Sequence, residues 1–210
     1  MRQPGIKICG VTRARDARLA VDLGADFIGL NFWPKSPRYL EREVAERIAT
    51  EIAGRAQIVG VWVDPSPQEV AAMAAALPLD LFQFHGEEEK RSVDWFPQRV
   101  IKAIRLGPNR ETIDLEAFDQ AWGFLFDCAP TGVYGGTGQT WSYERIATLE
   151  TPRPRFLAGG LAPDNVATAI AQSRADVVDV CSGVEATPGI KDPDLLERFF
   201  KEVHNVQTRD

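Results

Sequence analysis

Short runs of β-branched, leucine and phenylalanine residues recur along the chain, and apolar residues at helical spacing follow most of them. These runs predict eight strands: Ile6–Val11, Asp26–Phe32, Gln57–Val63, Leu79–Phe84, Arg99–Arg105, Gly123–Cys128, Arg155–Gly159 and Asp176–Cys181. Strands that alternate with helices indicate parallel pairing through right-handed crossovers.

The segments between these strands carry the helical pattern. The predicted helices are Arg15–Leu23, Glu41–Ile52, Gln68–Leu77, Ser142–Leu149, Pro163–Gln172 and Pro193–Val203, with weaker candidates at Glu87–Asp94 and Thr112–Gln120. Residues typical of helix starts precede three of them: Ser66-Pro67, Ser142 and Asp192-Pro193.

Eight strand–helix units without an intervening linker favour an α/β fold, a single (β/α)8 TIM barrel formed by residues 1–210. An open, doubly wound sheet is the structural alternative. Its dinucleotide fingerprint is missing, because Gly135-Gly136-Thr137-Gly138 does not keep the G-x-G-x-x-G spacing.

Composition and net charge limit the kinds of molecule that the protein is expected to bind. The formal net charge of -6 and the pI near 5.1 argue against general nucleic-acid binding, which needs a basic face. No apolar run approaches the roughly 18 residues of a membrane span, and the N-terminus lacks the pattern of a secretory signal, so we expect a cytoplasmic protein.

The three cysteines, Cys9, Cys128 and Cys181, lie far apart and fit free thiols, and no metal-ligand cluster is apparent.

Polar residues at the carboxyl ends of strands are the informative positions, because chemistry sits at that end of a parallel barrel. Side chains alternate along a strand, so Cys9 shares the inward face with Lys7, and Asp127 shares it with Leu125. A thiol and a carboxylate that converge from different strands make a candidate proton-transfer pair. Read singly, Cys9 fits a small buried apolar residue and Asp127 a loop cap.

Other candidate residues follow the remaining strands. His85 ends the fourth strand and fits a pocket-lining, acid–base or structural histidine, whereas Arg38 offers the bidentate geometry of a carboxylate clamp. Glycines at the ends of strands seven and eight allow backbone N–H groups to surround a phosphate, although tight turns need glycine too. The phosphate-site candidates are Gly159, Gly160, Ser182 and Gly183. The long loop Ala129–Trp141 fits a mobile lid or a surface excursion.

Taken together, these motifs resemble the phosphoribosylanthranilate isomerases of tryptophan biosynthesis along nearly the whole chain. The matching segments are Lys7-Ile8-Cys9-Gly10, Gly24-Ala25-Asp26, Pro34-Lys35-Ser36-Pro37-Arg38-Tyr39, Gln83-Phe84-His85-Gly86, Asp127 with Gly135-Gly136-Thr137-Gly138, Gly159-Gly160-Leu161 and Ser182-Gly183-Val184-Glu185. Cys181 stands where we expect the family to vary, and we assign it no catalytic role.

The resemblance implies an Amadori rearrangement of phosphoribosylanthranilate without a cofactor, with Cys9 as general base and Asp127 as general acid. It also implies that Arg38 binds the anthranilate carboxylate and that the glycine loops with Ser182 bind the phosphate. We count Lys7 and His85 among the substrate-binding residues as well. Chemistry near neutral pH then requires a lowered pKa for Cys9, supplied by Lys7 or the first helix, and a raised pKa for Asp127. We expect a small-molecule substrate and either a monomer or a homodimer.

Two classes of rival remain. The first class is a sibling barrel enzyme. An isomerase shared by histidine and tryptophan synthesis is expected to use two aspartates, and Cys9 at the position of one of them argues against this enzyme. Indole-3-glycerol-phosphate synthase is expected to use a lysine acid, for which no Lys–Glu motif is apparent. A barrel that only binds phosphate would keep the glycine loops but would not require Cys9 and Asp127.

Overall fold

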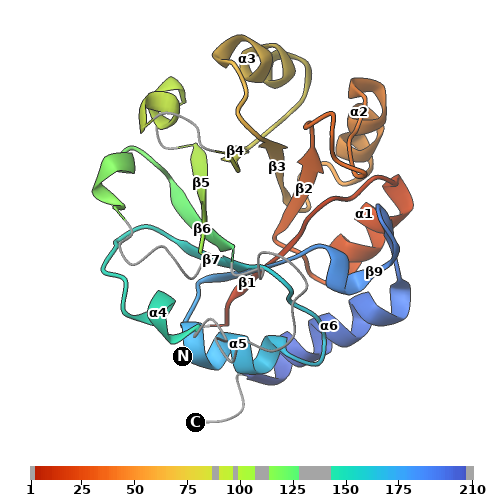
Figure 1. Ribbon diagram of the computed structural model, residues 1–210. Helices are drawn as coiled ribbons and strands as arrows, with labels where there is room; N and C mark the ends of the chain where they lie inside the picture. Colours follow the sequence, from red (N-terminus) through yellow and green to blue (C-terminus); the bar gives the residue numbers. More distant parts are fainter. Residues whose placement is uncertain (1–2, 87–89, 97–98, 107–113, 128–142, 207–210) are drawn as a thin grey trace.

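A closed barrel of parallel strands forms the centre of the molecule (Figure 1). The computed structural model describes residues 3–86, 90–96, 99–106, 114–127 and 143–206. The barrel strands follow one another in chain order: β1 (Gly5–Ile8), β2 (Phe27–Asn31), β3 (Gln57–Trp62), β4 (Leu81–Phe84), β5 (Val100–Arg105), β6 (Gly123–Asp127), β7 (Arg155–Ala158) and β8 (Val177–Val180). The predicted eight-stranded barrel is confirmed.

Helices and short turns surround the barrel (Figure 1). The helices are α1 (Ala14–Asp22), α2 (Arg42–Glu51), α3 (Pro67–Ala76), α4 (Glu144–Ala147), α5 (Val166–Ser173) and α6 (Pro193–Asn205). A short 3-10 turn, η3 (Ser182–Val184), leads from β8 into an antiparallel hairpin of β9 (Glu185–Thr187) and β10 (Ile190–Lys191). None of the helices among the described residues is long and apolar enough to cross a membrane.

The side chains alternate between two apolar layers, as the strand pattern predicts. Ile6 and Ile8 belong to the layer between strands and helices, together with Phe124 and Phe126. Leu125 belongs to the layer inside the barrel. Inward placement of the residues that alternate with the outer set, including Lys7 and Asp127, follows from this register.

The amino-terminal end of the barrel is tied by aspartates that precede strands. Each accepts a hydrogen bond of 2.7 to 2.8 Å from a backbone N–H of a neighbouring strand: Asp26 from Ile6, Asp80 from Ile58 and Asp176 from Arg155. A hollow at this end is lined by the same three aspartates. Because strand N–H groups already engage these carboxylates, we assign this end to stability, as is usual in the fold.

Capping residues set several helix starts. Ser66 accepts a hydrogen bond from the Glu69 N–H while Glu69 bonds back to Ser66, a complete capping box at α3. Asp192 caps α6 by accepting from the N–H of Leu195.

Some helix predictions are wrong in extent or type. The helix predicted from Pro163 begins at Val166, because the preceding turn is closed by Asn165 Oδ1, which accepts the N–H of Ala162. The structure has only α4 where Ser142–Leu149 is predicted, and Tyr143 rather than Ser142 precedes it; Ser142 lies outside the described residues.

The two weaker helix predictions are also wrong within the described residues. In place of Glu87–Asp94 and Thr112–Gln120 the structure has 3-10 turns, η1 (Lys90–Trp95) and η2 (Glu116–Phe118). The first of these turns is followed closely by Pro97, which cannot continue a helix. In the second, Asp114 accepts the N–H of Ala117, and this side-chain bond favours a tight turn.

Candidate active site

A buried ion pair lies beneath the carboxyl-terminal mouth of the barrel. β1 and β8 pair in a register that puts Lys7 opposite Asp179. The Lys7 ammonium lies 2.9 Å from Asp179 Oδ2, and the two side chains are 0% and 6% exposed. The second oxygen, Oδ1, has no hydrogen-bond partner among the described residues. Burial raises the pKa of Asp179 to about 7 although Lys7 opposes the shift.

Cys9 lies one residue beyond β1, directly above this ion pair and next to Gly29 of β2. A Cβ atom on Gly29 would lie 2.9 Å from Cys9 Sγ and 3.2 Å from Lys7 Nζ, so glycine leaves the space that both side chains fill. Cys9 packs against the apolar layer inside the barrel. It therefore points into the barrel mouth, as the sequence predicts.

Several groups lower the pKa of the Cys9 thiol well below its ordinary value. A hydrogen bond with the Cys181 side chain is the largest influence; burial opposes the shift, and the charges of Lys7 and Lys191 reinforce it. The same contact, together with burial, raises the pKa of Cys181. The two opposite shifts favour Cys9 over Cys181 as the thiol of this pair that ionises. Of the two sources predicted, Lys7 contributes, but Cys181 contributes more.

Asp127 ends β6 on another side of the mouth, where it meets His85, the residue that follows β4. The Nε2 atom of His85 lies 3.1 Å from Asp127 Oδ2, and both side chains are largely buried, at 24% and 14% exposure. Gln83 Nε2 lies 3.5 Å from the other ring nitrogen of His85. The structure thus brings His85 and Asp127 together, a contact that the sequence did not indicate.

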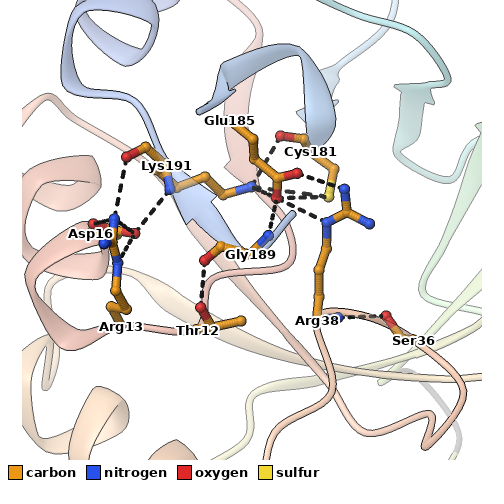
Figure 2. A network of polar contacts seen from close by, with 9 residues as sticks. All are labelled: Thr12, Arg13, Asp16, Ser36, Arg38, Cys181, Glu185, Gly189 and Lys191. Atoms are coloured by element: carbon orange, nitrogen blue, oxygen red, sulfur yellow. Dashed lines mark hydrogen bonds and ion pairs between the residues drawn. The ribbon is translucent and has the colours of Figure 1, made fainter. Parts of the chain in front are cut away.

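Arg38 is part of a polar network around Glu185 (Figure 2). Its Nε and Nη2 atoms donate to Glu185 Oε1 and Oε2 at 2.8 and 2.6 Å. A Cβ atom on Gly10 would lie 2.4 Å from Arg38 Cδ and 2.9 Å from Cys181 Sγ, and Gly10 has a φ of 66°. Glycine after Cys9 therefore lets the arginine and the second cysteine approach the mouth.

The same network fixes the hairpin after β8 to the start of α1 (Figure 2). Lys191, buried in this hairpin, donates its backbone N–H to Asp16 at 3.0 Å, and Arg13 donates to both oxygens of Asp16. Thr12 donates its hydroxyl to the carbonyl oxygen of Gly189. The hairpin is thereby tied to the barrel at several points.

The glycine loops predicted to hold phosphate meet at the ends of β7 and β8. Gly159 and Gly160 have φ values of 95° and 68°, which favour glycine. A Cβ atom on Gly183 would lie 1.9 Å from the carbonyl oxygen of Leu161, so the two loops touch through a position that only glycine fits. Ser182 is exposed at the start of η3.

Two predicted features lie outside the described residues. The lid predicted at Ala129–Trp141 and the third cysteine, Cys128, are not among them. Within the described ranges, no group of three or more His, Cys, Asp or Glu side chains is placed to hold a metal ion.

Sequence reasoning missed the polar residues that support the site. Asp179 interrupts the otherwise apolar strand Val177–Val180, and that interruption is a signal that could have identified it. Glu185 stood within a recognised motif but received no role. Lys191 carries no local signal, because its position at the site depends on the hairpin that folds back after β8.

The fold and the mouth together define a class: an α/β-barrel enzyme whose ionisable side chains gather at the carboxyl ends of the strands. The family model of N-(5'-phosphoribosyl)anthranilate isomerase matches residues 6–202. The chain therefore belongs to the phosphoribosylanthranilate isomerase family. The predictions of an isomerase of tryptophan biosynthesis and of the family resemblance are confirmed.

Individual relatives agree with the family model. The chain is 43% identical over 201 residues to the N-(5'-phosphoribosyl)anthranilate isomerase of Cellvibrio japonicus, an alignment covering 95% of this chain and 93% of the relative. It superimposes with a TM-score of 0.80 on monomers of the dimeric isomerase of Thermotoga maritima, at 33% identity, covering 96% of this chain and 98% of that one.

A third similar structure holds a ligand. It is a phosphoribosylanthranilate isomerase in complex with reduced 1-(o-carboxyphenylamino)-1-deoxyribulose 5-phosphate, with a TM-score of 0.76 and 32% identity. The alignment covers 96% of this chain and 99% of that chain.

Proposed function

We propose that the chain catalyses the Amadori rearrangement of N-(5-phosphoribosyl)anthranilate to 1-(2-carboxyphenylamino)-1-deoxyribulose 5-phosphate, with Cys9 as general base and Asp127 as general acid. The observation that carries the proposal is the environment of Cys9. Its thiol stands at the mouth above Lys7 and beside Cys181, and its pKa is lowered there, as a base needs.

The two residues carry out the first two proton transfers of the reaction. Asp127 donates a proton to the ribose ring oxygen, the bond from this oxygen to C1 breaks, and the anthranilate nitrogen forms a Schiff base with C1. Cys9 then removes the proton from C2, giving an enolamine that takes up a proton at C1 as the C2 hydroxyl becomes the ketone. The thiolate form of Cys9 is the form that can accept this proton.

His85 contacts Asp127, the proposed general acid. Its ring nitrogen lies 3.1 Å from the Asp127 carboxylate, a distance at which it restricts the rotation of that carboxyl group. We assign His85 to orienting Asp127 and lining the substrate pocket. Lys7 supports the thiolate of Cys9 from below.

Substrate binding is assigned to the two remaining parts of the mouth. Arg38 binds the anthranilate carboxylate, and the backbone of Gly159, Gly160 and Gly183 with Ser182 binds the phosphate. The ligand of the similar structure contains both a carboxyphenyl group and a phosphate, which supports this division. No cofactor is required by the two proton transfers.

The location, the domain organisation and the oligomeric state of the enzyme complete the proposal. We propose a cytoplasmic enzyme in which residues 1–210 form one barrel domain and act on a small molecule. The dimeric Thermotoga maritima relative makes a homodimer an open option beside a monomer.

The test is turnover of phosphoribosylanthranilate generated in place, followed through the loss of anthranilate-type fluorescence, for the wild type, Cys9→Ser and Asp127→Asn. We expect rapid turnover by the wild type and nearly complete loss in both variants, with their folded structure retained. Absence of wild-type turnover while sugar-phosphate binding persists would instead favour a sibling enzyme or a phosphate-binding barrel. Full activity of either variant would remove that residue from its role.

A further inference from the structure

Only one edge of the Arg38 guanidinium group contacts Glu185. The Nε and Nη2 atoms form one edge of the fork and donate to the two carboxylate oxygens. A guanidinium group has five N–H donors in a rigid plane, so a second edge, between Nη1 and Nη2, remains able to take another carboxylate. Within the described residues, Nη1 of Arg38 has no hydrogen-bond partner.

Glu185 is held more firmly than the arginine that it contacts. Its Oε1 atom also accepts from Lys191 Nζ at 3.0 Å and from the Gly189 N–H at 3.2 Å, and the Cys181 thiol lies 3.9 Å away (Figure 2). The Glu185 side chain is 4% exposed, whereas that of Arg38 is 20% exposed. The carboxylate is therefore the fixed end of the ion pair and the guanidinium is the end that reaches the mouth.

The charges of this cluster keep Arg38 charged and in place. Two cations, Arg38 and Lys191, share the Glu185 carboxylate, and Cys9, whose pKa is lowered, is a second anionic group that acts on both cations. Burial works against the charged form of Glu185, but hydrogen bonds from Arg38 and the charge of Lys191 lower its pKa. Glu185 therefore stays ionised and does not release Arg38 at neutral pH.

The position of the cluster connects it with the reaction. Arg38 Cδ and Cys181 Sγ both lie against Gly10, the residue after Cys9. An anion bound on the second edge of Arg38 is thus held beside the proposed base. An aromatic carboxylate bonded there would fix the substrate end that lies next to the reacting carbons.

We propose that Glu185, anchored by Lys191, is a positioning residue that aims the second edge of Arg38 at the carboxylate of the substrate. The inference rests on the proposed function and adds the residue that sets the direction of the clamp. A merely structural role of Glu185 would affect all ligands alike. A positioning role of Glu185 would instead affect only the ligands that carry the carboxylate.

The experiment compares wild type, Glu185→Gln and the matched control Glu43→Gln, whose side chain is 67% exposed on α2. Two probes are used: reduced 1-(2-carboxyphenylamino)-1-deoxyribulose 5-phosphate and its phenylamino analogue without the carboxylate. We expect Glu185→Gln to weaken binding of the carboxylate probe by about 10- to 100-fold, the size of one lost charge-assisted contact. The dissociation constant of the other probe should stay within about 3-fold of the wild-type value. KM should rise by a similar factor while kcat changes little.

Further variants keep the result interpretable. Arg38→Lys should show the same selectivity, and adding Glu185→Gln to it should cost little more, because both act on one clamp. If Glu185→Gln does not fold, Glu185→Asp, which keeps the charge but shortens the reach, should show the same selective loss.

Equal weakening of both probes, or no weakening of either, in a folded Glu185 variant would overturn the inference. The proposed function would fail separately, through absence of wild-type turnover. Because the two probes are compared by binding alone, the positioning role is tested in either case.

Discussion

Replacing Lys7 by methionine would leave the Asp179 carboxylate buried without its ion-pair partner. The two groups are 2.9 Å apart, with side-chain exposures of 0% and 6%, so water cannot take over the role of the ammonium. Removal of one partner of such a buried pair costs about 3–5 kcal/mol of stability. We expect Lys7→Met to lose a free energy of unfolding in this range at about pH 8.

The pH dependence of this loss has a definite sign. Burial already raises the pKa of Asp179 to about 7, and without Lys7 it rises further, whereas an unfolded aspartate titrates near 3.9. A group with a raised folded pKa contributes stability at low pH and loses it as the pH rises through that folded pKa. The loss caused by Lys7→Met should therefore be clearly smaller at about pH 5 than at about pH 8.

Urea unfolding at both pH values measures the effect, with the double variant Lys7→Met/Asp179→Leu as control. The double variant removes both charges and should recover most of the lost stability, because an apolar pair of similar volume is usually tolerated. Cys9 and His85, the other ionisable groups that act on Asp179, are present in both variants, so they cancel when the two variants are compared. A loss below about 1 kcal/mol at pH 8, or an equal loss at both pH values, would refute the reasoning.

Three further predictions concern other parts of the structure. Alkylation of Cys9 by iodoacetamide should stay fast well below the ordinary thiol pKa of about 8.5, and Cys181→Ala should move the profile upward; an ordinary profile in the wild type would contradict this. Gly183→Ala should lower the affinity for inorganic phosphate at least about tenfold, because its Cβ meets Leu161 O, whereas Gly24→Ala, whose φ of 104° strains an alanine although its Cβ meets no other atom, should leave phosphate binding of the folded protein unchanged in the same titration. Ser66→Ala should cost about 0.5–2 kcal/mol in thermal unfolding without changing turnover, and a loss of activity would show that this capping box matters to the site.

The order of elements was predictable because each strand carries its own apolar run. The alternation in Lys7-Ile8-Cys9 gave the inward face correctly, since a two-residue period depends only on local geometry. Short connections were predicted less well. A proline beyond Trp95 and an aspartate cap before Ala117 reduce the expected helices to 3-10 turns.

The site was predictable only where a single strand end carries the chemistry. Cys9 and Asp127 stood out because polar side chains at these positions are unusual in a packed barrel. Contacts between distant segments could not be read from spacing. Asp179 meets Lys7 across 172 positions and Glu185 meets Arg38 across 147, and closure of the barrel with its terminal hairpin brings each pair together.

The pH dependence of kcat/KM for the wild type and Asp127→Asn tests the acid–base assignment most directly. For the wild type we predict a bell-shaped profile whose ascending limb lies below the ordinary thiol pKa of about 8.5, because Cys9 is the base. In Asp127→Asn the residual activity should lose the descending limb and keep the ascending one. A wild-type profile that is flat from acid to alkaline pH would contradict proton transfer by these two residues.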